Sequence, residues 1–113
     1  FLFGVNVLKF LTTLPSNDGL NVPKHQLAKA STSIGANYEE AQAAESRSDF
    51  IHKIGISLKE SRESHYWLRV IRALTSGSPK QKALDEFITE AAEFKRIFSS
   101  IKLSAQKNRP IKK

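Results

Sequence analysis

The sequence predicts an all-α fold, an antiparallel up-and-down four-helix bundle formed by a single domain over residues 1–113. Three observations support this prediction. The chain has 113 residues, of which 40% are hydrophobic and 26% charged, which is enough for one compact core and typical of a globular domain. Four segments repeat apolar residues every three or four positions, the spacing that keeps one face of a helix apolar. Only a few residues connect these segments, so consecutive helices are expected to run antiparallel.

The first two helices are delimited by proline and by small polar residues. Pro15 and the run 16–19 are predicted to end the first helix, and Val22-Pro23 to start the second, which then runs to about Glu45. Since the chain contains no methionine and begins with Phe1, we expect the natural start to lie upstream and the first helix to be truncated. The predicted core positions are Phe3, Val7, Phe10 and Leu14 in the first helix, then Leu27, Ala30, Ile34, Asn37, Ala41 and Ala44 in the second.

The third and fourth helices are longer. Ser48 is the expected N-cap of the third, which ends at residues 76–78 after about 27 residues, roughly 40 Å. Pro79 is expected to open the fourth, which frays into a basic tail from about residue 104. The predicted core positions are Ile51, Ile54, Leu58, Ser61, His65 and Leu68 in the third helix, then Leu84, Phe87, Ala91, Phe94, Phe98 and Ile101 in the fourth.

The net charge of +7 is concentrated at the C-terminal end. Five of the eighteen basic residues occupy positions 102–113, which contain no acid, so residues 1–101 carry thirteen basic and eleven acidic residues, a net charge of +2. A basic tail binds phosphate backbones without reading sequence, or it simply keeps the end of the chain in solution.

Basic residues also occur on the last two helices. Arg62 and Arg69 lie seven positions apart, hence on one helix face, with Tyr66 between them as a candidate stacking group. The alternative is an ordinary solvated face. The candidate nucleic-acid-binding residues are Arg62, Arg69, Arg72, Lys95, Arg96, Lys102, Lys107, Arg109, Lys112 and Lys113.

The third helix carries a second apolar stripe about half a turn from its core positions. It consists of Ile56, Trp67, Val70 and Leu74. A monomeric bundle would leave this stripe in water, so we predict that it forms a self-association interface.

A polar residue, Asn37, occupies a core position of the second helix. A buried amide can fix the pairing of helices, provided that it finds hydrogen-bonding partners. The sequence therefore predicts a buried polar network, comprising Asn37, Glu40, Glu60, Glu63 and His65.

Enzymatic activity is not expected. Cysteine is absent, so thiolate metal sites and cysteine nucleophiles are excluded. The chain has no Glu-x-x-His pair of the di-metal bundles, no Gly-x-Ser-x-Gly motif and no glycine-rich phosphate loop. We predict no metal, no cofactor and no membrane-spanning segment. A metal-dependent enzyme would require Glu40, Glu60, Glu63 and His65 to converge.

Two stretches carry a resemblance to a known family. Residues 31–42 (STSIGANYEEAQ), the following DFIHK at 49–53 and LKESRESHYWLR at 58–69 resemble the bacterial 23S ribosomal RNA intervening-sequence proteins. The likeness is close over the second and third helices and extends to the rest only in pattern. The family motif corresponds here to Asn37, Glu40, Glu60, Glu63 and Trp67, to which it assigns no catalytic role.

The resemblance implies a small bacterial, cytoplasmic four-helix bundle similar to members that assemble as homopentameric rings. A related bundle, the accessory variability determinant of diversity-generating retroelements, is a basic pentamer that works with nucleic acid. With the charge pattern, this favours a non-enzymatic homo-oligomer that binds RNA or DNA without sequence preference. The alternative is a protein-interaction or scaffold subunit that binds no nucleic acid.

Overall fold

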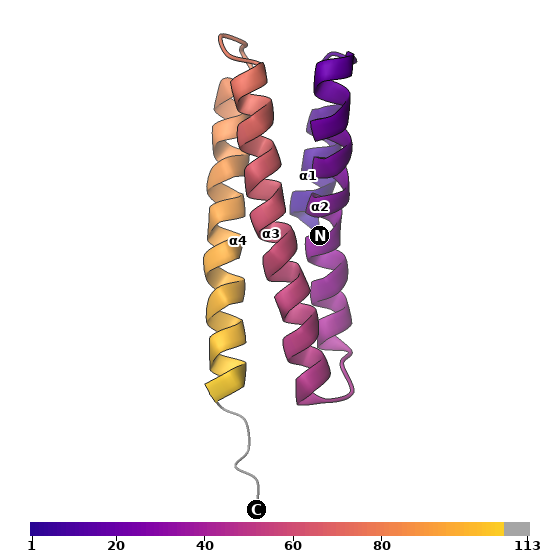
Figure 1. The fold of residues 1–113 in the computed structure, drawn as a ribbon, viewed down its shortest axis with the longest axis vertical. Coiled ribbons are helices and arrows are strands. Elements are labelled where there is room, and N and C mark those ends of the chain that lie inside the picture. The colour runs from indigo at the N-terminus through magenta and orange to yellow at the C-terminus, as the bar shows by residue number, and fades with distance from the viewer. Residues whose placement is uncertain (108–113) are drawn as a thin grey trace, which may run out of the picture.

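The protein folds into four helices, described here in a computed structural model for residues 1–107. They are α1 (Leu2–Leu11), α2 (Asp18–Gln42), α3 (Arg47–Leu74) and α4 (Gln81–Lys107), and no strand occurs within these residues. The helices run alternately up and down in chain order, and α3 packs against both α2 and α4 (Figure 1). The predicted all-α four-helix bundle is therefore confirmed.

The short helix α1 covers only part of the bundle's 59 Å length, and its start lies near mid-height in Figure 1. Its backbone approaches α2 closely at Gly4, where an added Cβ would lie 3.2 Å from the carbonyl oxygen of Ser31. The absence of a side chain at Gly4 thus allows α1 and α2 to pack closely. Toward α4, α1 packs through aromatic rings, with Phe3 and Phe94 5.2 Å apart between ring centroids.

Two helices begin earlier than the sequence predicts. Helix α2 starts at Asp18 because the side chain of Asn17 accepts a hydrogen bond from the backbone N–H of Leu20 at 2.9 Å. The polar run 16–19 therefore starts α2 as well as following α1, and Pro23 lies inside the helix. Similarly, Ser46 caps α3 by accepting from the N–H of Asp49 at 3.0 Å, a role that the sequence assigned to Ser48.

The boundaries of α4 differ from the prediction at both ends. Pro79 lies in the preceding turn, where the hydroxyl of Ser78 accepts from the N–H of Lys80, and the helix begins at Gln81. At its other end α4 continues to Lys107.

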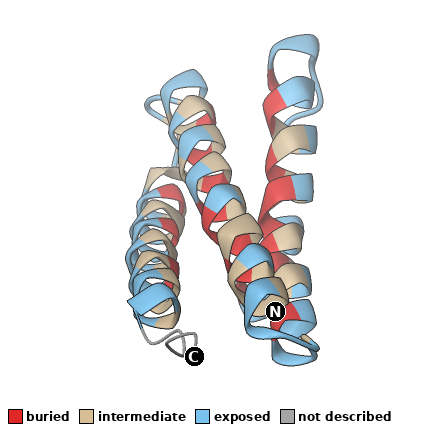
Figure 2. Ribbon diagram, turned by 60° about the horizontal axis from the view of Figure 1, so that its bottom comes forward, coloured by how far each residue is buried: buried red, intermediate tan, exposed pale blue. Residues whose placement is uncertain are grey.

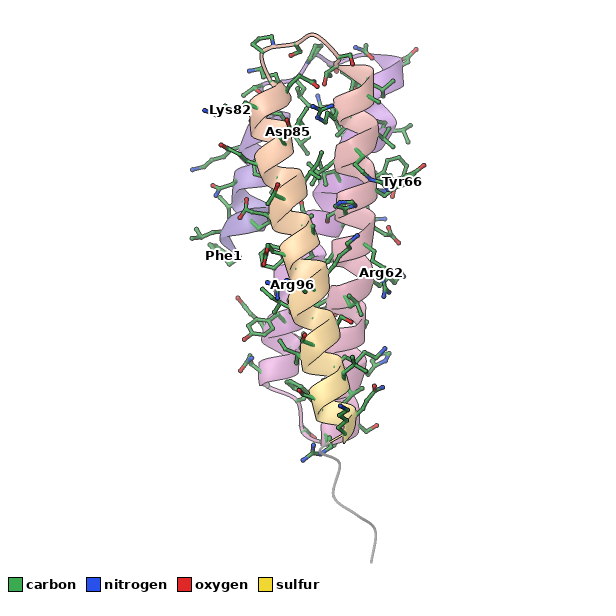
Figure 3. All side chains as sticks on the ribbon, turned by 90° about the vertical axis from the view of Figure 1, so that its left-hand side faces the viewer. Phe1, Arg62, Tyr66, Lys82, Asp85 and Arg96 are labelled. Carbon is green, nitrogen blue, oxygen red and sulfur yellow. The ribbon has the colours of Figure 1, made fainter. Side chains whose placement is uncertain are left out.

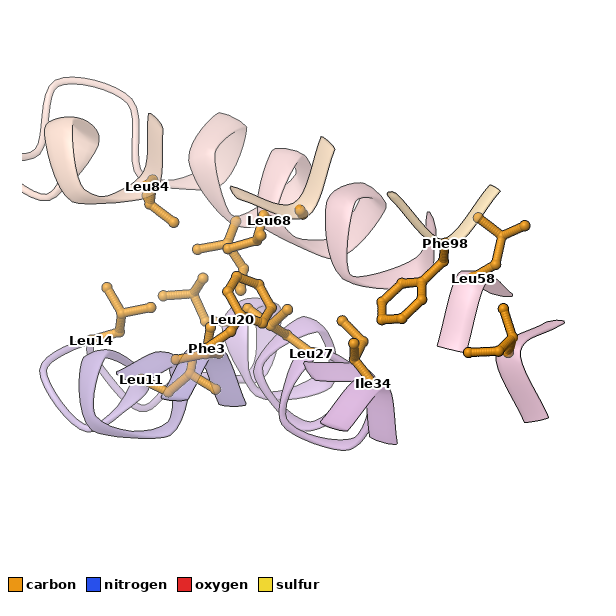
Figure 4. Packing of buried hydrophobic residues seen from close by; sticks show 14 of the residues in the cluster. Phe3, Leu11, Leu14, Leu20, Leu27, Ile34, Leu58, Leu68, Leu84 and Phe98 are labelled. Atoms are coloured by element: carbon orange, nitrogen blue, oxygen red, sulfur yellow. The ribbon is translucent and has the colours of Figure 1, made fainter. Parts of the chain in front are cut away.

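The core follows the predicted stripes (Figures 2 and 4). Leu27, Leu68 and Leu84 are completely buried, one on each of the three long helices. Serines extend this core on α3: Ser57, Ser61 and Ser64 are also fully buried. The hydroxyl of Ser57 donates to the backbone oxygen of Ile34 on α2 at 3.0 Å, so a small polar side chain joins α2 and α3 within the core.

Candidate nucleic-acid interface

Helix α3 presents a basic, aromatic stripe to the outside. Lys59, Arg62, Tyr66 and Arg69 follow one another at steps of three and four residues, so they share one helix face. Both arginines and the lysine are exposed, as is Tyr66. Figure 3 shows Arg62 and Tyr66 projecting from the outer edge of α3, on the opposite side of the view from Phe1.

Helix α4 adds two cations to this stripe. Lys95 lies close enough to His65 of α3 to act on its ionisation: burial lowers the pKa of His65, and the positive charges of Lys95 and Arg69 lower it further. Lys102 crosses toward α3, where its Nζ lies 3.5 Å from the position that a Cβ on Gly55 would occupy. We call Lys59, Arg62, Arg69, Lys95 and Lys102 together the basic face.

At one end of the basic face there is an open depression of about 450 Å³. Gly55 lies in it, and the absence of a side chain there leaves room for Lys102 to lie against α3. Lys59 and His52 line the same depression, whose described lining contains no acidic residue. An electropositive hollow of this kind suits a phosphate group.

The remaining predicted binding residues are engaged elsewhere or lie at the chain end. Arg72 pairs with Asp85 of α4 through its Nε at 2.5 Å, which lowers the pKa of Asp85, and Arg96 pairs with Glu93 of its own helix. Both pairs are exposed, so they hold these arginines only weakly. Lys107 is the last residue of α4. Arg109, Lys112 and Lys113 lie outside the described residues.

One carboxylate of α3, that of Glu60, lies on the side of the helix toward α2. Burial raises the pKa of Glu60, the negative charge of Glu63 raises it further, and Lys59 and Lys29 of α2 oppose this. The influence of Lys29 shows that Glu60 lies toward α2. Glu63 lies one turn after Lys59 on the same side of α3, so an acidic side chain borders the basic face there.

The predicted polar residues do not form a buried network in the folded chain. The amide of Asn37 donates to the backbone oxygen of Ser33 in its own helix at 2.9 Å. Glu40 is exposed, and Glu60, Glu63 and His65 are only half-buried. The helix backbone supplies the partner that Asn37 needs, and the long carboxylates reach solvent. Within residues 1–107, no group of three or more potential ligands could hold a metal ion.

The direction of the Glu60 shift predicts a pH-dependent stability. A carboxyl group with a raised pKa in the folded state stabilises the fold below its unfolded pKa, near 4.3, and this contribution is lost as pH rises through the folded pKa. We expect Glu60→Gln to raise the free energy of unfolding at pH 7 by about 0.5 kcal/mol, and this gain to shrink toward pH 4. Urea denaturation of the variant and the parent protein at both pH values measures this change in the free energy of unfolding. Glu40→Gln, at an exposed position of α2, is the matched control, and a destabilised Glu60→Gln variant at pH 7 would contradict the expectation.

The second apolar stripe of α3 lies beside the basic face, on the side toward α2. Trp67 is half-buried and packs against the core, Ile56 and Val70 are half-buried, and Leu74 remains 55% exposed. Seen around the helix axis, Trp67 lies on the same side as Glu60, toward α2, whereas Arg62 and Arg69 lie toward α4. The stripe and the basic face nevertheless adjoin, since the ring of Trp67 contacts that of Tyr66 and Ile56 lines the same depression as Lys59.

Sequence reasoning alone missed two residues of the site, Lys59 and Gly55. The signal for Lys59 was present, since it precedes Tyr66 by seven residues just as Arg62 precedes Arg69. The role of Gly55 could not be predicted from the sequence, because it depends on the approach of Lys102, which lies 47 positions further along the chain. In the described part of the chain, no helix is long and apolar enough to cross a membrane.

Fold and site together define a class of protein, an all-α four-helix bundle with a basic outer face. The chain matches the family described as 23S rRNA-intervening sequence protein over residues 1–100, and it belongs to that family. It is also similar to a crystal structure of a protein of unknown function from the S23 ribosomal protein family of Bacteroides thetaiotaomicron VPI-5482. The two share 32% sequence identity and a TM-score of 0.77, over 88% of this chain and 91% of that one. Comparison with curated proteins gave no match.

Proposed function

We propose that this protein is a homo-oligomer that binds RNA or DNA without sequence preference through the basic face of α3 and α4. The observation that carries the proposal is the convergence of five cations from two helices, with Glu60 of α3 turned toward α2. Lysine and arginine side chains on a convex helical surface contact phosphates rather than base edges, so the binding is independent of sequence. The description of the family by a ribosomal RNA intervening sequence agrees with an RNA context.

Titration of fluorescently labelled RNA and DNA oligonucleotides of unrelated sequence tests the proposal. We expect similar affinities for all sequences at low salt and a steep loss at higher salt, because log K falls by about 0.7 per phosphate contact for each unit of log salt on single strands. A chain lacking residues 108–113 should retain most of this binding. Complete loss of binding in this shortened chain would show that the binding site lies in the tail. No binding by the full chain at low salt would favour the scaffold function instead.

Self-association through the second stripe of α3 accompanies the proposal. Leu74 and Val70 offer apolar surface near the end of α3 remote from the Gly55 depression, so copies can associate there and leave that depression open. The family resemblance suggests a pentamer. In such a ring the basic face would recur in every subunit, and weak phosphate contacts would become multivalent.

The double variant Val70→Lys/Leu74→Lys should convert the oligomer to monomers while its helical circular dichroism stays unchanged, because charges at an apolar interface oppose its burial. We choose these positions over Trp67, whose ring also packs against the core of its own chain. Sedimentation velocity measures the outcome. Leu103→Lys, at an exposed position of α4, serves as control. An unchanged sedimentation coefficient in the double variant, or a monomeric parent protein, would contradict the proposed interface.

A further inference from the structure

We infer that the basic face takes single-stranded nucleic acid, with the ring of Tyr66 stacked on one base of the strand. The inference rests on the proposed function and names the form of nucleic acid that the face accepts.

The ring of Tyr66 is available for contact from outside. It lies in the middle of α3 and is 49% exposed, although the fold buries several other aromatic rings around Phe3 and Phe98. Arg62 lies one turn before it and Arg69 one turn after it on the same face. An exposed aromatic ring between two guanidinium groups matches a base that has a backbone phosphate on either side.

Neighbouring side chains hold this ring in place. The guanidinium carbon of Arg69 lies 5.9 Å from the centroid of the Tyr66 ring, a cation–π distance. The ring of Trp67 meets it at nearly a right angle, with centroids 5.0 Å apart, and Trp67 itself packs against the core. A ring that is already supported loses little conformational freedom when a base stacks on it.

The shape of the face favours a single strand over a duplex. In a duplex the base faces are stacked on one another inside the helix, so a protruding ring reaches only phosphates and groove edges. In a single strand the bases can turn outward and stack on an aromatic side chain. Because every base has a π-face, stacking adds affinity without adding sequence preference.

The depression at Gly55 extends the contact along the helix. It lies eleven residues before Tyr66 on α3, hence about 16 Å away along the helix axis. Lys59 and Lys102 line it, and they would hold a backbone phosphate while Tyr66 holds a base. The two contacts define a path for one strand along α3.

Fluorescence anisotropy on Tyr66 variants of the full chain tests the inference. The probes are an oligouridylate of about 12 nucleotides and a mixed-sequence duplex of the same length, at low salt. Tyr66→Leu should bind the oligouridylate roughly 5- to 150-fold more weakly, the range that stacking on one base provides, and leave duplex affinity unchanged. Tyr66→Phe retains the ring and should bind like the parent. Arg62→Gln should weaken both probes, since it removes a phosphate contact.

The intrinsic fluorescence of Trp67, the single tryptophan of the chain, gives a second readout. Its ring contacts Tyr66, so a stacked base should change its emission when oligouridylate is added. If the parent protein binds both probes and Tyr66→Leu binds oligouridylate equally well, the stacking inference is overturned while the proposed function stands. If Tyr66→Phe weakens binding as much as Tyr66→Leu, the hydroxyl rather than the ring makes the contact, which also overturns it. If the parent binds neither probe, the proposed function itself fails.

Discussion

Replacing Leu68 with alanine should lower the free energy of unfolding by about 2–5 kcal/mol. Leu68 is completely buried on α3, the helix that packs against both α2 and α4, and it lies within the contiguous apolar cluster of Figure 4. Truncation removes apolar contacts and leaves a cavity that two neighbouring helices cannot both close. Urea denaturation followed by circular dichroism measures the change.

Leu103→Ala is the matched control for this prediction. Leu103 lies on α4 and is 57% exposed, so its truncation should change the free energy of unfolding by less than about 0.5 kcal/mol. A loss at position 68 no larger than at position 103 would mean that α3 does not occupy the centre of the core.

Reversing two charges of the basic face should produce the largest functional effect. We expect Arg62→Glu/Arg69→Glu to weaken binding of single-stranded RNA at low salt by about 100-fold or more, since two phosphate contacts are lost and two repulsions are introduced. Both positions are exposed, so the fold should tolerate the change. Anisotropy titration against the parent protein measures the loss.

A control with the same change in net charge separates a local site from general electrostatic attraction. Lys80→Glu/Lys82→Glu reverses two charges, one just before α4 and one in its first turn, where Figure 3 shows Lys82 near the top of the bundle, twenty residues before Lys102. We expect it to weaken binding far less. Equal losses in the two double variants would show that net charge alone, and not the basic face, determines affinity.

The core and the helices could be predicted because they depend on spacing within one segment. Apolar residues such as Leu27 and Ile34 repeat at helical intervals, and burial follows from that repeat. The helix starts were harder to predict, because a polar run beside a proline can either end one helix or cap the next. Asn17 was taken as part of a helix end, but its side chain caps the following helix, and Pro23 is tolerated within that helix.

The site could be predicted only in part, because charge pairing depends on contacts between helices. Arg72 and Arg69 look alike in the sequence, yet Arg72 meets Asp85 of the next helix while Arg69 lies over Tyr66. Asn37 occupies a core position by spacing, and only the structure shows that its amide turns to the backbone of its own helix. Nucleic-acid binding by the tail residues beyond Lys107 stays a prediction.

Photo-crosslinking with mass-spectrometric localisation tests the central claim most directly. A short RNA containing a photoreactive uridine is bound to the full chain at low salt, irradiated and digested, and the crosslinked peptides are identified. The account predicts crosslinks on α3 around Tyr66 and on α4 around Lys102, with none on α2. Crosslinks confined to α2, or to residues 108–113, would contradict it.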